Sequence, residues 1–247
     1  MTETHEDRLT AIYRRAEIYE AVYRGRGKDY EAEAAQITAL VRERRPDASS
    51  LLDVACGPGT HLGHLSGSFE RVEGVDLAED MVRLAAANLP GTPVHQGDMR
   101  SFDLGRRFDA VICMFSSIAH LSEAAEVEAT LARLAAHTEP GGVIVLEPWY
   151  FPERATERHV SSALVTVEGR TIARVSHSLY RDGAHHMDVH YTVASPEEGV
   201  EHFIDVHVLA VHRREVYEKA FAAAGCSVEY IPGPGPGLFV GVAGGPA

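Results

Sequence analysis

Glycine and aspartate residues follow apolar segments of this 247-residue sequence. Gly57 and Gly59 come just after the apolar segment 51–55, and Asp76 closes the segment 71–76. In an open parallel sheet, ligands bind beyond the carboxyl ends of the strands, and glycines let a ligand approach the backbone there. The Asp76 carboxylate can accept hydrogen bonds from both hydroxyls of a ribose, although it could also cap the helix that follows. The pattern favours a ribose-containing ligand.

The glycine spacing argues against a dinucleotide. A dinucleotide loop needs a third glycine three residues after the second, but Leu62 stands at that position here. At the next two strand ends, Asp98 can accept a hydrogen bond from an adenine amine while Met99 packs on the ring. Met114 could lie beside a sulfonium and a methionine chain. Three strand ends therefore offer contacts to one adenosyl group.

Alternating apolar and helical segments must position these residues. We expect helices over about 7–23, 28–45, 78–88 and 122–137, and strands over about 51–55, 71–76, 94–95, 108–114 and 142–147. This order predicts an α/β fold with a doubly wound, mostly parallel sheet.

After residue 150 the alternation of strand and helix segments gives way to strand segments separated by turns. Glycine-containing turn sequences at 168–170, 181–183 and 196–199 predict an inserted antiparallel sheet of about four strands. A helix over 213–224 and two antiparallel strands near 227–230 and 238–242 then return to the main sheet. We expect a core of residues 1–150 with N-terminal helices, an inserted substrate-binding subdomain of residues 151–212, and residues 213–247 completing the core sheet.

Composition excludes several classes of function. The net charge of −13 argues against a nucleic-acid partner, which needs a basic face. No apolar run reaches the roughly 20 residues of a membrane span, and no signal-peptide core follows the first residues. Three scattered cysteines suit the cytoplasm. His186 and His190 could share a strand face, but no carboxylate or cysteine pattern completes a metal site, so we expect no metal.

Three segments resemble the signatures of class I S-adenosylmethionine-dependent methyltransferases, namely residues 52–60, 74–77 and 97–100. This resemblance implies S-adenosylmethionine as the cofactor and a Rossmann-like fold. It places Leu77 with the other residues of the cofactor site.

A narrower resemblance covers roughly residues 15–242. Segments 114–121, 147–152, 174–178 and 237–241 look like those of actinobacterial N,N-dimethyltransferases of dTDP-3-amino-deoxysugars, which serve antibiotic biosynthesis. The resemblance implies a dTDP-amino sugar as the small-molecule partner and is compatible with a homodimer, although the sequence shows no exposed apolar stripe. It adds Tyr19, Tyr30 and Ala55 to the cofactor site, and Phe151 and Ser176 to the substrate site.

The residues suit an amine acceptor. Much of the rate of methyl transfer can come from aligning the amine lone pair with the sulfonium methyl. His120 is the candidate catalytic residue, to accept the amine proton or orient the amine, although it could also be a packing histidine. Trp149 and Tyr150 offer flat surfaces to a thymine ring or sugar. Arg174 could pair with the diphosphate, or lie on a strand face without contacting substrate.

Two other functions are compatible with the sequence. An O-methyltransferase acting on a sugar or another small natural product would need a stronger base than an amine requires. A non-catalytic S-adenosylmethionine-binding protein would not need Trp149, Arg174 or His120. Members of the family that this chain resembles carry an arginine just before the Gly-Leu-Phe segment, where this sequence has Pro236. Glu147 could orient the substrate or only pack in the core.

Overall fold

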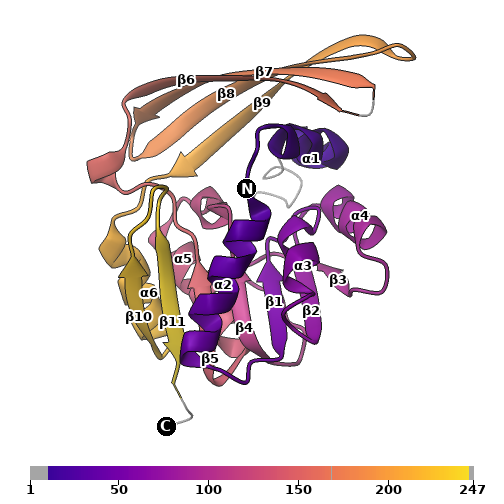
Figure 1. The fold of residues 1–247 in the computed structure, drawn as a ribbon. Coiled ribbons are helices and arrows are strands. Elements are labelled where there is room, and N and C mark those ends of the chain that lie inside the picture. The colour runs from indigo at the N-terminus through magenta and orange to yellow at the C-terminus, as the bar shows by residue number, and fades with distance from the viewer. Residues whose placement is uncertain (1–10, 168, 245–247) are drawn as a thin grey trace.

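The computed structural model describes residues 11–167 and 169–244. The larger of its two sheets holds seven strands (Figure 1). The strands are β1 Ser50–Val54, β2 Arg71–Asp76, β3 Val94–Gln96, β4 Phe108–Cys113, β5 Thr138–Leu146, β10 Cys226–Ile231 and β11 Leu238–Ala243. Their order is β10-β11-β5-β4-β1-β2-β3. β1 pairs in parallel with both β2 and β4, whereas β11 is antiparallel to β5 and β10. The strand order reverses between β1 and β4, so the predicted fold class is confirmed.

The described part of the chain holds six α-helices, of which five cover the faces of this sheet and the first packs against a second, smaller sheet. They are α1 Ala16–Gly25, α2 Tyr30–Arg44, α3 Thr60–Leu65, α4 Glu79–Asn88, α5 Ala124–Ala136 and α6 Arg214–Ala223, with 3-10 turns η2 Ala11–Arg14, η3 Ser117–His120 and η4 Pro152–Arg154. The helix expected over 7–23 is confirmed from Ala16, where α1 begins, but residues 11–15 do not continue it: η2 is a separate 3-10 turn, and Ile12 N donates to Asp205 Oδ1 at 3.1 Å. Residues 7–10 lie outside the described residues.

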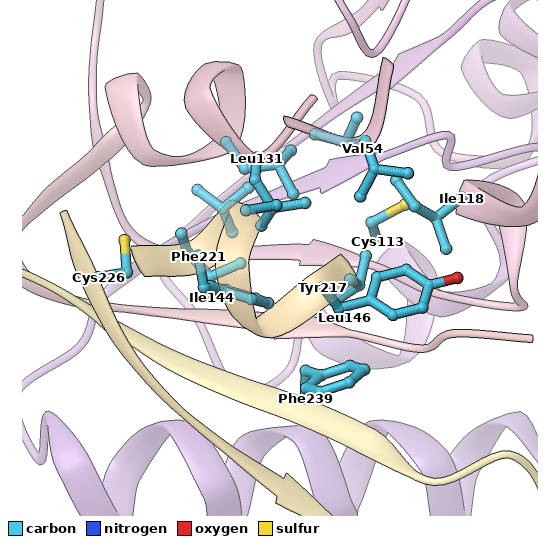
Figure 2. Close-up of a cluster of buried hydrophobic side chains, with 14 of the residues drawn as sticks. Val54, Cys113, Ile118, Leu131, Ile144, Leu146, Tyr217, Phe221, Cys226 and Phe239 are labelled. Carbon is cyan, nitrogen blue, oxygen red and sulfur yellow. The ribbon is translucent and has the colours of Figure 1, made fainter. Parts of the chain in front are cut away.

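The alternation of strand side chains divides the core into two layers. α2 and α3 pack on one face, where β1 presents Leu51 and β4 presents Ile112. α5 and α6 pack on the other, where Val54 and Cys113 meet Leu131 and Phe221 (Figure 2). Burial on both faces explains the continuous apolar segments that marked these strands in the sequence.

The second sheet holds four antiparallel strands in the order β6-β7-β8-β9. They are β6 Arg158–Val167, β7 Arg170–Arg181, β8 Ala184–Ser195 and β9 Gly199–Ala210. The sheet lies across the top of the molecule in Figure 1, with α1 beneath it. Its inner face packs through Ile172 and Val189 against Ile12 and Val22.

The exposed outer face of this second sheet carries seven apolar side chains beside polar ones such as His190 and Asp188. Alternation along the strands places there Val160, Leu164, Val175, Val200, Ile204, Val206 and Val208, all about half exposed or more. The expectation of no exposed apolar stripe is therefore wrong. Each strand contributes only every second residue to this face, so the residues form one recognisable surface only when the four strands are paired.

No helix in the described part of the chain combines the length and apolar character needed to cross a membrane.

Candidate functional site

A cavity of about 680 Å³ separates the two sheets. Its floor is formed by residues at the carboxyl ends of the parallel strands, and its other walls come from η2, α1 and the inner side of β7, β8 and β9. This is the edge of the sheet where the strand order reverses, so the fold brings the predicted strand-end residues to one chamber.

The turn after β1 opens into this cavity. Ala55 and Gly57 line it, and both have positive φ angles of 60° and 56°. A Cβ on Gly57 would meet no atom within 4 Å, so it would project into open space. The backbone at Gly57 is thus accessible to a ligand, as the sequence predicts.

Gly59 has a different role in the structure. It does not line the cavity, and a Cβ there would lie 2.9 Å from Leu89 Cδ1 and 3.3 Å from Ala85 Cβ of α4. Its φ of 81° also favours glycine at the start of α3. Close packing against Leu89 and Ala85 therefore explains the glycine at this position.

Two further expected cofactor residues lie outside the cavity lining. Met114 is 5% exposed and packs in the core layer beneath α2 and α3. Tyr30 packs edge-on against His61, with ring centroids 4.9 Å apart. Leu77, Met99 and Tyr19 do line the cavity.

Asp76 combines the two roles that the sequence left open. Its Oδ1 accepts a hydrogen bond from Ala78 N at 2.9 Å near the start of α4, and its Oδ2 accepts one from Gly57 N at 2.8 Å. The side chain also lines the cavity. Burial raises the pKa of this carboxyl, and the backbone N–H groups oppose that rise. Each carboxylate oxygen keeps lone-pair capacity for a ligand hydroxyl.

Asp98 lies in the cavity wall but is already paired. Arg100 Nε donates to its Oδ1 at 2.9 Å, and Arg100 Nη2 contacts its Oδ2. Arg100 also binds Glu126 Oε1 at 2.6 Å. A ligand amine would therefore meet a carboxylate whose orientation the arginine fixes.

His120 faces the same cavity from the end of η3. Its Nε2 lies 2.9 Å from the Tyr13 hydroxyl. Burial, with a smaller contribution from His207, lowers the pKa of His120 to about 4. Burial raises the pKa of Tyr13, so its hydroxyl stays protonated; it donates to one tautomer of the neutral imidazole and accepts from the other.

Aromatic rings form a continuous wall beside His120, and the sequence indicated only one of them, Tyr19. The Tyr19 and Tyr23 ring centroids lie 4.6 Å apart, and the Tyr23 and Phe115 rings are nearly perpendicular at 4.9 Å. The spacing of Tyr19 and Tyr23 on one helix could have revealed the second ring. Tyr13 and Phe115 carry no such signal, since they reach the cavity only through tertiary packing.

Arg174 is a buried cation in the wall formed by the second sheet. It is 5% exposed, and it lines the cavity together with Met187. Its Nη1 donates to Ser176 Oγ at 3.1 Å, and its Nη2 lies 3.8 Å from Met187 Sδ. Arg174 forms no ion pair with any carboxylate among the described residues. Ser176 supports the guanidinium but does not line the cavity itself.

The segment after β5 contributes two of the three residues expected there. Trp149 and Tyr150 line the cavity, and Trp149 Nε1 donates to His185 Nδ1 at 2.8 Å. Phe151 points into the core against Phe239 and Tyr217. Phe151 therefore lies outside the cavity lining and anchors the segment to the core.

The second sheet also carries several histidines. His190 Nδ1 lies 3.3 Å from His202 Nε2 on its exposed face. In the part of the chain that the structure describes, no group of three or more histidine, cysteine, aspartate or glutamate residues is arranged to hold a metal ion.

Comparison with known proteins agrees with this geometry. Residues 51–142 match the model of a methyltransferase domain. The chain is 53% identical to the dTDP-3-amino-3,4,6-trideoxy-alpha-D-glucopyranose N,N-dimethyltransferase of Streptomyces venezuelae, over 92% of this chain and 97% of that protein. It is 52% identical to the dTDP-3-amino-3,6-dideoxy-alpha-D-glucopyranose N,N-dimethyltransferase of Streptomyces fradiae, over 93% and 91%.

A solved structure adds a cofactor complex to the comparison. The SAM-bound amino pentose methyltransferase CalS10 of Micromonospora echinaspora superimposes with a TM-score of 0.84 at 48% identity, covering 91% of this chain and 96% of that one. The chain belongs to the family of S-adenosylmethionine-dependent N,N-dimethyltransferases of dTDP-amino-deoxysugars.

Proposed function

We propose that this chain methylates, twice in succession, the amino group of a dTDP-linked 3-amino-deoxysugar that is destined for an antibiotic. The carrying observation is one cavity that runs from the strand-end residues around Asp76 to the buried guanidinium of Arg174, which has no carboxylate partner among the described residues. The first end suits an adenosyl group and the second suits a diphosphate, so methyl donor and acceptor can meet between them. S-adenosylmethionine supplies an electrophilic methyl group on its sulfonium.

The cofactor end has the features that this group requires. Gly57 leaves its backbone open, and Asp76 has lone pairs for the ribose hydroxyls. We assign Ala55, Leu77, Asp98 and Met99 to the remaining contacts with the adenosyl group, and Tyr19 to the aromatic wall beside it. Gly59 and Met114 would support this end through packing, without touching the ligand. Tyr30 would act through His61.

His120 orients the amine in this proposal and does not deprotonate it. With a pKa of about 4, the imidazole is a much weaker base than an alkylamine, so proton transfer to it is unfavourable. When the Nε2–H of neutral His120 donates to the Tyr13 hydroxyl, Nδ1 is left to accept an N–H of the amine and so to align its lone pair for attack. The proton released by methylation then passes to solvent. A hydroxyl acceptor would need a strong base, which favours the amine over the O-methylation alternative.

The acceptor end suits a nucleotide. The Arg174 fork can bind phosphate oxygens in place of the carboxylate partner that it lacks among the described residues. Trp149 and Tyr150 present rings at 5.1 Å from each other that a thymine or sugar can contact. Pro236 also lines the cavity, but its side chain has no charge to bind a phosphate. We therefore assign the phosphate contact to Arg174 of the second sheet. All three cysteines are buried and unpaired, which suits the reducing cytoplasm.

We also propose that two copies pair through the outer face of the second sheet. Four strands of 10 to 12 residues cover roughly 700 Å², close to the ~800 Å² per partner of a standard interface. In a two-fold dimer the same apolar residues of both copies would face each other and be removed from water. In analytical ultracentrifugation, Leu164→Glu should yield monomers while Arg83→Glu, on an exposed helix, should not. A wild-type monomer would refute the pairing.

Mass spectrometry of a dTDP-3-amino-3,6-dideoxyhexose incubated with the protein and S-adenosylmethionine tests the activity. We expect one and then two added methyl groups. Absence of methylation, with cofactor binding confirmed by calorimetry, would overturn the amine as the acceptor and direct the search to hydroxyl compounds.

A further inference from the structure

The turn that follows β4 has an unusual backbone. Phe115 and Ser116 both lie in the left-handed region, with φ angles of 57° and 55°. Few residues other than glycine adopt this conformation, and two in succession must be stabilised by their surroundings. Such backbone strain is concentrated at functional sites.

Glu147, just after the end of β5, stabilises this turn. Phe115 N donates to Glu147 Oε2 at 2.8 Å, and Ser116 Oγ contacts Glu147 Oε1 at 3.4 Å and Pro148 O at 2.7 Å. Glu147 N in turn donates to Cys113 O at 2.9 Å, which ties the ends of β4 and β5 together. The carboxylate is mostly buried, and burial raises its pKa.

The turn controls two parts of the cavity. The Phe115 ring stands perpendicular to Tyr23 and lies 4.2 Å from Lys28 Nζ, so it forms one end of the aromatic wall. Ser116 is the N-cap residue of η3, which ends at His120. A shift of Phe115 and Ser116 would therefore displace the wall and the histidine together.

We infer that Glu147, although it lines the cavity, is a positioning residue for methyl transfer that acts by holding the Phe115–Ser116 turn. The inference rests on the proposed function, because the groups that it positions are those assigned to the amine. A carboxylate that bound the amine directly would instead need its charge.

Four variants separate these two roles. Glu147→Gln keeps an oxygen that accepts from Phe115 N but loses the charge, so kcat should remain near that of the wild type. Glu147→Ala removes the acceptor, and kcat should fall about 100-fold because of misalignment, while the calorimetric Kd for S-adenosylmethionine changes little. Adding Ser116→Gly to Glu147→Ala should restore kcat about tenfold, because glycine adopts a positive φ without strain. Ser116→Gly alone is the fourth variant, and it gives the effect of the glycine on kcat while Glu147 is still present.

An exposed carboxylate on β10 is the control. Glu229→Gln should leave kcat and both ligand affinities unchanged. Equal losses of kcat in Glu147→Gln and Glu147→Ala would overturn the inference in favour of a charge contact with substrate, as would the absence of any rescue by Ser116→Gly. If the wild type methylates no dTDP-amino sugar, the proposed function fails. Crystal structures then decide the inference, since φ at residues 115 and 116 must change in Glu147→Ala and stay unchanged in Glu147→Gln.

Discussion

Replacing Arg174 with methionine should affect binding and stability in opposite directions. The guanidinium is 5% exposed and is held by Ser176 Oγ and Met187 Sδ, with no carboxylate partner among the described residues. A buried charge with neutral partners is costly to the folded chain, and it becomes favourable only when an anion binds. Methionine matches the length of the apolar stem and can pack beside Met187.

The structure sets the size of both effects. Hydrogen bonds to charged groups contribute about 1.5–3 kcal/mol, so loss of the phosphate contact should raise the KM for the nucleotide sugar about 10- to 100-fold. Ser176 Oγ keeps a contact with Ser161 O at 3.5 Å, so the substitution leaves no isolated hydroxyl. Removal of the buried charge should then stabilise the free protein by about 1 kcal/mol, which raises Tm by roughly 2–4 °C.

Steady-state kinetics and differential scanning fluorimetry without ligands measure these two quantities. Arg170→Met is the matched control, because Arg170 lies on the same strand but is exposed and pairs with Glu17 at 3.2 Å. We expect the control to change neither KM nor Tm appreciably. A lower Tm in Arg174→Met together with weaker binding would show that Arg174 is mainly structural, and an unchanged KM would refute the diphosphate assignment.

Three further predictions concern the cofactor end and His120. Asp76→Ala should weaken S-adenosylmethionine binding about 100-fold in calorimetry, through loss of two charge-assisted hydrogen bonds, and leave sugar-nucleotide binding largely intact; equal losses would contradict the assignment. Gly59→Ala should lower Tm more than Gly57→Ala does, because the new methyl group would meet Leu89. Gly57→Ala should weaken cofactor binding more than Gly59→Ala does, because the methyl group at residue 57 would enter the cavity. The reverse order of either effect would refute the distinction between the two glycines. The pKa of His120 is about 4 in the folded chain and near its ordinary 6.5 when unfolded, so the unfolded chain binds an extra proton between these values. The free energy of unfolding should therefore decrease by up to about 3 kcal/mol as pH falls from 6.5 to 4, and urea titrations of His120→Gln should lack that part of the decrease.

Much of the fold and half of the site could be predicted from the amino-acid sequence. The apolar segments and turn residues indicated the parallel sheet, the inserted antiparallel sheet and the antiparallel pair at the C-terminus, because each pattern is local in the chain. The methyltransferase class and its cofactor, predicted from the segments around Gly57, Asp76 and Asp98, are confirmed by membership of the family. Residues next to a strand end keep their place in any sheet of this topology.

Several residues that the sequence placed in the site pack in the core instead of lining the cavity, because one position decides which way a side chain points. Met114 and Phe151 follow strand ends as Gly57 and Trp149 do, yet they point into the core layers. Successive side chains near a strand alternate between faces, so a segment can be assigned to a site while an individual residue in it is misplaced. Gly59 shows a related limit, since a glycine required by helix packing looks like one required by a ligand.

The acceptor half was decided by tertiary structure. Tyr13 reaches His120 across 107 positions of sequence, and Glu147 closes a turn that lies 32 positions before it. The sequence places Arg174 on a strand. Only the packing of the second sheet buries its charge without an ion pair to any described carboxylate. Local pattern determined which residues stand at the strand ends; burial and long-range contacts, which depend on the whole chain being packed, decided their charge state and partners.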